Sequence, residues 1–303
     1  MKTHRLRRTL LASLLVAAVA VPLSGAATRA AVPAPAALAF TAADRPAERY
    51  AANRTALAEA ARLAAAHGDR RRATNLRALA GGRLLAFDGR GRGRIAEVFG
   101  DLERARRIAV LVPGSDVRLD TYGGRFRRGA AALSARLGPD AAVVTWLGYD
   151  TPDTAGPEVL TPGRAEEAAP GLRAFVGLLR AFNADAPVAA LCHSYGAVVC
   201  GRAARGLDVT DLVLYGSPGT GADTAAQLGT GARVWAGRAS GDWVARLPHA
   251  RVELFGTTLG LGPDPAEPAF GARRFAVGDG GHGDYLEPGG AGLRAIAALV
   301  EAA

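Results

Sequence analysis

The apolar run that ends at Ser194 is the part of the sequence with the clearest chemical meaning. Residues 188–199 read VAALCHSYGAVV, which is a run of strand length, a turn with one serine and the start of a small-residue helix. This layout is typical of a nucleophile elbow, which holds a serine hydroxyl on a sharp strand-to-helix turn. The positions two before and two after the serine must be small, and Cys192 and Gly196 occupy them. We interpret Ser194 as a candidate nucleophile, although Cys192 replaces the usual first glycine and an ordinary strand–helix turn remains the alternative.

A serine nucleophile needs a base to take its proton, and position favours His282 among the five histidines. Where such elbows occur, the acid and then the histidine follow the serine along the chain, each on a loop after a strand. His282 follows the last expected strand and has glycines on both sides, which let the backbone bring it close to Ser194. His193 is adjacent to the serine and should point away from its hydroxyl. The alternative for His282 is a histidine of a surface loop.

The candidate for the acid that orients the histidine is Asp242. It lies in the segment Ala239–Val244, in the loop after the penultimate expected strand and between the serine and the histidine in sequence. Three other aspartates are less well placed. Asp211 precedes its strand, Asp223 belongs to a short helix, and Asp284 is too close to His282 in sequence.

Two backbone N–H groups are needed to stabilise the oxyanion of an acyl-transfer reaction. Tyr195, directly after the nucleophile, is expected to supply one. The other is expected from the loop of Gly114, Ser115 and Asp116 after an early strand, although Pro113–Gly114 could be a plain turn. Trp146 and Tyr149 end a strand at the same sheet edge. They are candidates for the substrate pocket, with core packing an equal alternative, and the loop 151–162 is a candidate lid or acyl-pocket segment.

These residues require a framework of alternating strands and helices. The sequence predicts strands over 108–112, 142–146, 212–215 and 233–236, the elbow strand from Val188, a last strand near Phe275, and an antiparallel hairpin over 84–87 and 94–99. Helices are predicted over 46–66 and 293–300, and where apolar residues recur at helical spacing, from Phe126 to Leu137 and from Leu172 to Phe182. Strands that are buried on both faces and joined by helices favour an α/β fold with a mostly parallel sheet.

The N-terminus predicts export. Residues 1–8 are basic, residues 10–23 are apolar and small residues follow, so we assign 1–30 to a signal peptide, 31–80 to a flexible leader with a helical extension and 81–303 to the main domain. The apolar run is short for a membrane span, which needs about 20 residues. We expect a secreted protein without stable membrane insertion, by the Sec or the twin-arginine route, with an uncleaved anchor as the alternative. N-terminal sequencing of the exported protein tests this expectation.

Composition argues against several other classes of function. The formal net charge of +9 comes from arginines that are scattered among acidic residues, so we expect no nucleic-acid partner. No cluster has metal-ligand spacing, and the glycine-rich segment 89–93 lacks the helix and the Lys-Ser/Thr of a phosphate loop, so neither metal nor cofactor is expected. Cys192 and Cys200 bracket the elbow. We slightly favour two free thiols, because a sheet and its helix are about 10 Å apart and a disulfide needs Cα atoms within about 7 Å.

Several segments together resemble one known family. They are Gly100–Leu102, Val110–Gly114, Trp146–Asp150 with Pro152, His193–Gly196, Tyr215–Gly219 and the loops of Asp242 and His282. In this order, across roughly residues 50–300, they resemble an actinobacterial α/β-hydrolase family known as a domain of unknown function (DUF1023). The family's elbow usually begins with Gly, where this chain has Cys192. The resemblance implies an α/β-hydrolase fold and a Ser–Asp–His triad, and says almost nothing about substrate.

The sequence thus predicts a secreted serine hydrolase that cleaves carboxylic esters or thioesters through an acyl-enzyme. Its partner would be a small-molecule or lipid-like acyl substrate. An acyltransferase would use the same residues with an acceptor other than water. A non-catalytic binding module on a hydrolase scaffold is the alternative from another class, and a fluorophosphonate probe would discriminate it.

Overall fold

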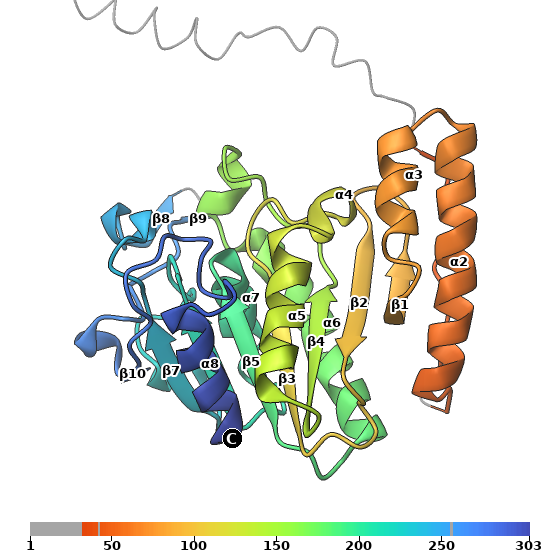
Figure 1. Cartoon of the computed structure of the whole chain (residues 1–303). Helices are drawn as coiled ribbons and strands as arrows, with labels where there is room; N and C mark the ends of the chain where they lie inside the picture. The colour runs from red at the N-terminus through yellow and green to blue at the C-terminus, as the bar shows by residue number, and fades with distance from the viewer. Residues whose placement is uncertain (1–31, 42, 255–256) are drawn as a thin grey trace, which may run out of the picture. The chain divides into compact units, whose positions relative to one another are not determined.

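The computed structural model describes residues 32–41, 43–254 and 257–303 (Figure 1). The predicted signal peptide, residues 1–30, lies outside the described residues. Residues 32–303 form one compact unit, and none of its described helices is long and apolar enough to cross a membrane.

An eight-stranded sheet runs through this unit in the order β1-β2-β4-β3-β5-β6-β7-β10. The strands from β3 onward pair in parallel, while β1 and β2 form an antiparallel hairpin that joins the sheet through β4. Because the central strands are buried on both faces, their sequences are continuous apolar runs. The bounds are β1 Arg83–Asp88, β2 Arg94–Phe99, β3 Arg107–Val112, β4 Ala141–Leu147, β5 Val188–His193, β6 Asp211–Tyr215, β7 Arg233–Gly237 and β10 Arg273–Arg274.

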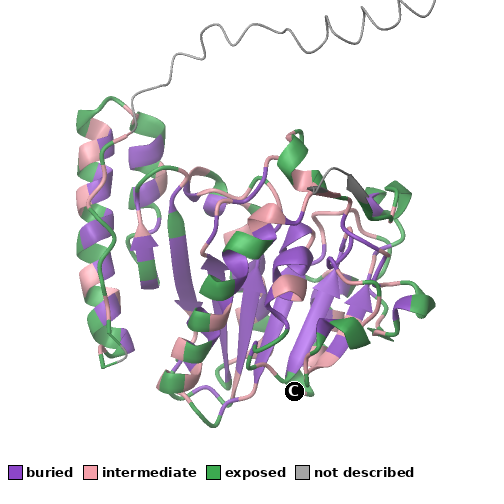
Figure 2. Ribbon diagram, turned by 180° about the vertical axis from the view of Figure 1, so that it is seen from behind, coloured by how far each residue is buried: buried purple, intermediate pink, exposed green. Residues whose placement is uncertain are grey.

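Helices cover both faces of the sheet (Figure 1). Side chains alternate along each strand, so Val110 packs on one face with α6 and α7, while Leu111 packs on the other with α5 and α8. Figure 2 shows the buried strands between these layers. The helices are α4 Leu119–Tyr122, α5 Arg125–Leu137, α6 Gly163–Phe182, α7 Tyr195–Ala203 and α8 Ala291–Glu301.

The N-terminal helices lie against the hairpin end of the sheet. Helix α2 (Pro46–Ala66) follows the predicted bounds, and α3 (Arg70–Arg77) comes directly after it. The alanine-rich face of α2 has few large side chains, so it packs closely on β1 around Leu57, Leu84 and Phe87. The helical extension therefore shares its core with the sheet.

The predicted α/β fold is confirmed, and most strands match their predicted ranges within one or two residues. The strand expected near Phe275 is shorter, with only Arg273 and Arg274 paired to β7. A separate hairpin, β8 (Val252–Leu254) with β9 (Thr257–Leu259), follows the loop of Asp242. Four short 3₁₀ turns complete the described part of the chain: η1 Pro157–Leu160, η2 Ala226–Leu228, η3 Trp243–Arg246 and η4 Pro268–Phe270.

Candidate active site

Ser194 lies on a strained turn between β5 and α7. Its backbone has φ 54° and ψ −127°, and it is one of two residues other than glycine with positive φ in the described part of the chain. The turn brings the helix unusually close to the neighbouring strand: a Cβ at Gly196 would lie 2.5 Å from the carbonyl oxygen of Val112. Gly196 therefore cannot carry a side chain, and the strained backbone raises the Ser194 hydroxyl above the sheet.

The two cysteines beside this turn form a disulfide, so the preference for free thiols was wrong. Cys192 and Cys200 are buried, with their Cα atoms 6.4 Å apart. The ordinary spacing between a sheet and its helix does not apply here, because α7 begins within two residues of the strand end and passes close to it at Gly196. The disulfide ties the second turn of α7 to the strand that carries Ser194.

The structure brings Ser194, His282 and Asp242 together. His282, on the loop between β10 and α8, has Nε2 2.9 Å from Oγ of Ser194 and Nδ1 3.0 Å from both carboxylate oxygens of Asp242. A carboxylate accepts only, so Nδ1–H donates to Asp242 and Nε2 is left to accept the proton of the serine hydroxyl. This chain of hydrogen bonds is the geometry that a serine–histidine–acid triad requires.

The carboxylate of Asp242 is buried and has three hydrogen-bond donors. Besides His282, the N–H of Val244 donates to Oδ1 at 2.9 Å, and the hydroxyl of Tyr285 donates to Oδ2 at 2.6 Å. Burial by itself would raise the pKa of the Asp242 carboxyl, but the hydrogen bonds from His282, Tyr285 and Val244 outweigh it and lower the pKa. Asp242 is therefore an anion that is held in one orientation facing His282.

Tyr285 should act as a positioning residue for this carboxylate. Its hydroxyl also accepts from the N–H of Ala239, so it links both sides of the loop that carries Asp242. We expect Tyr285→Phe to lower kcat for a soluble ester by about tenfold, because a hydrogen bond to a charged group is worth about 1.5–3 kcal/mol. Steady-state kinetics and thermal unfolding of the two proteins measure this effect.

The matched control is Tyr122→Phe, which removes the 2.7 Å hydrogen bond from another buried tyrosine to Glu97, a carboxylate that is not bonded to the triad. This control should lose stability and keep kcat. Equal kcat losses in both variants would contradict a specific role of Tyr285.

His193 contacts both the ring and the backbone of His282. Its ring contacts the His282 ring with centroids 4.7 Å apart and planes tilted by 37°, and its Nε2 is 2.8 Å from the backbone oxygen of His282. Burial, together with the neighbouring His282 ring, lowers the pKa of His193 to about 3, so the ring is neutral near pH 7. A neutral ring with its proton on Nε2 donates to that oxygen. Through this hydrogen bond His193 holds the loop that carries the catalytic histidine candidate.

Gly114, Ser115 and Tyr195 surround the Ser194 hydroxyl. A Cβ at Gly114 would lie 2.6 Å from Cβ of Ser194, so only glycine allows this loop to approach the serine. Within the described chain, the N–H groups of Ser115 and Tyr195 have no protein hydrogen-bond acceptor. Tyr195 N–H also belongs to the N-terminus of α7, whose free N–H groups favour negative charge. These groups are thus available for an oxyanion.

Trp146 and Tyr149 do not line the cavity above Ser194, which corrects their assignment to a substrate pocket. Both side chains are 4% exposed and stack on each other in the core beside Phe175. Helix α6 covers the strand end that carries them, so their rings pack between the sheet and this helix. The hydroxyl of Tyr149 donates to the backbone oxygen of Pro113 at 2.7 Å and so supports the Gly114 loop from within.

The Ser194 hydroxyl opens into a cavity of about 850 Å³ with mostly apolar walls. Its few charged lining residues are Asp116, Arg125 and Asp284. No group of three His, Cys, Asp or Glu side chains among the described residues is arranged to hold a metal ion. Large apolar side chains of the wall come from five regions of the chain: Val117 and Phe126; Val159 and Leu160; Trp243, Val244 and Leu247; Leu261; and Leu286.

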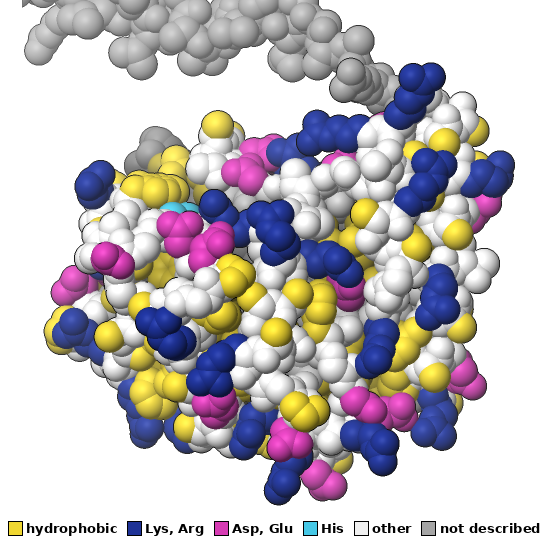
Figure 3. All heavy atoms as spheres, in the orientation of Figure 1, with side chains coloured by type: hydrophobic (Ala, Val, Ile, Leu, Met, Phe, Trp, Pro, Cys, Tyr) yellow, Lys and Arg dark blue, Asp and Glu magenta, His cyan; other side chains and the backbone are white. Residues whose placement is uncertain are grey.

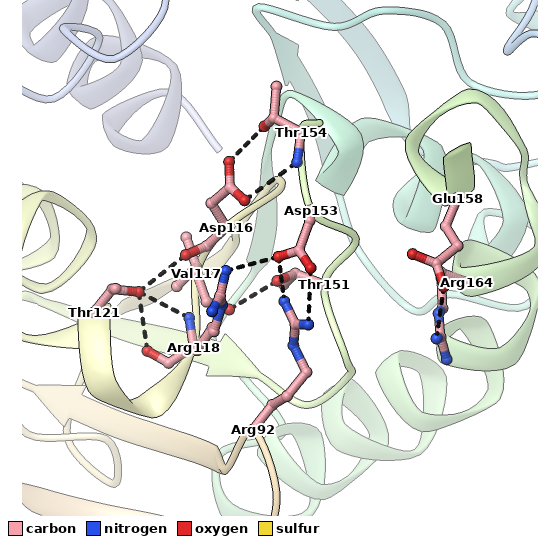
Figure 4. A network of polar contacts seen from close by, with 10 residues as sticks. All are labelled: Arg92, Asp116, Val117, Arg118, Thr121, Thr151, Asp153, Thr154, Glu158 and Arg164. Atoms are coloured by element: carbon pink, nitrogen blue, oxygen red, sulfur yellow. Dashed lines mark hydrogen bonds and ion pairs between the residues drawn. The ribbon is translucent and has the colours of Figure 1, made fainter. Parts of the chain in front are cut away.

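A polar network joins the Gly114 loop to the loop that was expected to form a lid (Figure 4). Asp116, the other described residue besides Ser194 that has positive φ and is not glycine, accepts hydrogen bonds from the hydroxyl of Thr154 at 2.6 Å and from its N–H at 3.2 Å. Asp153 accepts from Arg92 and Arg118, both at 2.7 Å, so the loop is anchored at two adjacent residues. The loop then continues to the cavity wall at Val159.

Comparison with known proteins decides the family. The model of the family described as Alpha/beta hydrolase matches residues 88–252. The chain belongs to the alpha/beta hydrolase family. The match includes Ser194 and Asp242 and stops before His282.

This alpha/beta hydrolase is similar to two uncharacterized proteins of Mycobacterium tuberculosis. Rv2079 is 32% identical over 246 residues, which cover 70% of this chain and 37% of that protein. Rv0963c is 38% identical over 144 residues, which cover 43% of this chain and 54% of that protein. The chain therefore spans only about a third to a half of the length of these relatives.

Among solved structures, the hydrolase is similar to esterase PE8, with 19% identity and a TM-score of 0.44 over 68% of this chain and 96% of that one. It is also similar to esterase LipW from Mycobacterium marinum, with 17% identity and a TM-score of 0.45 over 81% of this chain and 89% of that one.

Two supporting residues of this alpha/beta hydrolase, His193 and Tyr285, were not found from its sequence as parts of the site, and neither was the contact of Asp116 with Thr154. His193 and Tyr285 flank predicted residues, and both contact the triad through their ring or hydroxyl. Asp116 lies next to Ser115, but its partner Thr154 is far away in sequence. For His193 and Tyr285, the only available signal was their closeness in sequence to Ser194 and His282.

Proposed function

We propose that this chain is a serine hydrolase that cleaves carboxylic esters or thioesters through an acyl-enzyme. The observation that carries the proposal is the hydrogen-bonded series from Ser194 through His282 to Asp242 at the base of an apolar cavity. Family membership agrees with this chemistry, but the site residues, and not the fold, are the argument for it.

The proposed reaction has two halves. Oγ of Ser194 attacks the carbonyl carbon while His282 Nε2 takes the hydroxyl proton, and the N–H groups of Tyr195 and the Gly114–Ser115 loop hold the resulting oxyanion. The intermediate then expels the alcohol or thiol, which receives the proton from His282. In the second half, His282 deprotonates a water molecule that attacks the acyl carbon, and Ser194 regains a proton as the acid leaves.

The character of the cavity wall favours an acyl chain as the part of the substrate that the protein binds. Its walls are mainly aliphatic and aromatic, so burying a chain there removes apolar surface from water. The charged residues Asp116, Arg125 and Asp284 belong to the lining but form only a small part of it.

A fluorophosphonate probe tests the proposal directly. We expect stoichiometric labelling of the intact protein at Ser194, because a serine that is activated by a histidine attacks the phosphorus of the probe, expels fluoride and becomes phosphonylated. Peptide mass spectrometry locates the label. Ser240, on the exposed loop before Asp242, is the internal control and should stay unlabelled. A folded protein that remains unlabelled, or that is labelled equally at both serines, would contradict an activated Ser194.

A further inference from the structure

The exposed apolar side chains of this protein are concentrated around the mouth of the cavity above Ser194. Six large hydrophobic side chains are exposed in the described part of the chain, and five belong to segments that border this cavity. We call these five the apolar rim: Leu160, Trp243, Leu247, Val252 and Leu259. Figure 3 shows hydrophobic side chains gathered over the region of β8 and β9.

The rim is built from three segments of the chain, two of which are joined by a hydrogen bond. Leu160 ends η1, and its backbone oxygen accepts a hydrogen bond from Gly260, directly after β9, at 2.8 Å. Trp243 and Leu247 come from η3 and the residue after it. Val252 and Leu259 are directly paired across the β8–β9 hairpin, so their side chains lie on the same face of it.

The rim continues into the catalytic cavity. Leu160, Trp243 and Leu247 are exposed and also line the cavity, and the Trp243 ring lies 5.0 Å from the ring of His282. The apolar surface therefore extends from the outside of the protein to the triad. Arg246, exposed on η3 between Trp243 and Leu247, adds a cation at the same edge.

We propose that the apolar rim docks on the surface of a lipid aggregate or membrane and that acyl chains enter the cavity from there. This inference rests on the proposed hydrolase function and names water-insoluble acyl lipids as the substrate class. Exposed apolar groups clustered at one surface favour insertion at the boundary between headgroups and acyl chains, and Arg246 favours anionic headgroups.

A lipid surface fits the rim better than a second copy of the chain. Five side chains around an opening are far fewer than the roughly 20–30 residues that each partner supplies in a standard protein interface. A protein seated there would also close the cavity over Ser194. A lipid surface covers the same side chains and still delivers a substrate.

The first test measures lipid contact without turnover. Full-length protein with Ser194→Ala is mixed with vesicles of phosphatidylcholine and phosphatidylglycerol in equal amounts, in which the phosphatidylcholine carries brominated acyl chains. We expect the tryptophan fluorescence to be quenched, because Trp243 would enter the acyl region. Adding Trp243→Phe should remove this quenching, since the other two tryptophans lie outside the rim: Trp146 is buried in the core, and Trp235 on β7 is hydrogen-bonded to Asp211.

The second test removes rim side chains that do not line the cavity. Val252 and Leu259 are 57% and 43% exposed, so Val252→Ser with Leu259→Ser should weaken vesicle binding by about tenfold or more. The matched control is Leu38→Ser. Leu38 is 42% exposed and is the one large exposed hydrophobic side chain of the described residues outside the rim, so this variant should bind as the parent does. When Ser194 is restored, the double variant and the Leu38→Ser control should both hydrolyse a soluble short-chain ester at the parent rate.

The outcomes separate this inference from the proposed function. Absence of quenching, unchanged binding of the double variant or an equal loss with Leu38→Ser would overturn the docking surface. A parent dimer that the double substitution converts to monomers would assign the rim to a second copy instead. If the double variant loses its activity on the soluble ester, the vesicle-binding test is repeated with the single variant Val252→Ser. Failure of the parent to hydrolyse any ester would count against the hydrolase function itself.

Discussion

Ser194→Ala is expected to lower kcat for a soluble ester by about 10⁶-fold and to leave the fold unchanged. The hydroxyl is the only atom that is lost, and the reaction then has no nucleophile 2.9 Å from His282. Removing the serine of a comparable triad has an effect of this size, since the three residues act as a unit. Steady-state kinetics on one ester, at enzyme concentrations high enough to detect the residual rate, measures it.

The fold of this variant should persist because the backbone at position 194 is held by its surroundings. The N–H of Ser194 donates to the backbone oxygen of Tyr215 at 3.1 Å, and alanine keeps that hydrogen bond. Ser240→Ala, on the exposed loop before Asp242, is the matched control and should keep full activity. Equal activity of folded Ser194→Ala and the parent would remove Ser194 as the nucleophile.

The order of the strands and the candidate triad could be predicted because each depends on local signals. Apolar runs of five or six residues marked β3, β4 and β5, and a buried parallel strand leaves few other interpretations. Each member of the candidate triad follows a strand. Because the carboxyl ends of parallel strands meet at one sheet edge, their positions in sequence already implied that they meet in space.

The errors came from features that depend on three-dimensional packing. The pairing of Cys192 with Cys200 depends on how closely α7 passes the strand at Gly196, which average sheet–helix spacing does not describe. The orientation of Trp146 depends on α6, which covers that end of β4. Likewise, Thr154 meets Asp116 only through the path of a long loop.

Asp242→Asn is the second prediction with a large expected effect, a fall in kcat of about 10⁴-fold in a folded protein. The carboxylate now accepts from Nδ1–H of His282 at 3.0 Å, which leaves Nε2 free to take the proton of Ser194. An amide can donate to Nδ1 instead, and this favours the tautomer with its proton on Nε2, which cannot act as the base. It also removes the negative charge that stabilises the imidazolium formed during reaction.

The same change at two other aspartates provides the controls for Asp242→Asn. Asp284 accepts from the N–H of Gly281 at 2.8 Å, and Asp223 pairs with Arg251 at 2.9 Å, so neither carboxylate is bonded to the His282 ring. Asp284→Asn and Asp223→Asn should therefore keep kcat within about tenfold of the parent, since each removes at most a partly exposed interaction. If either of these variants lost as much activity as Asp242→Asn, or if Asp242→Asn stayed active, the acid partner of His282 would not be Asp242. The buried carboxylate of Asp242 would then have a structural role, which its bonds to Val244 and Tyr285 would explain.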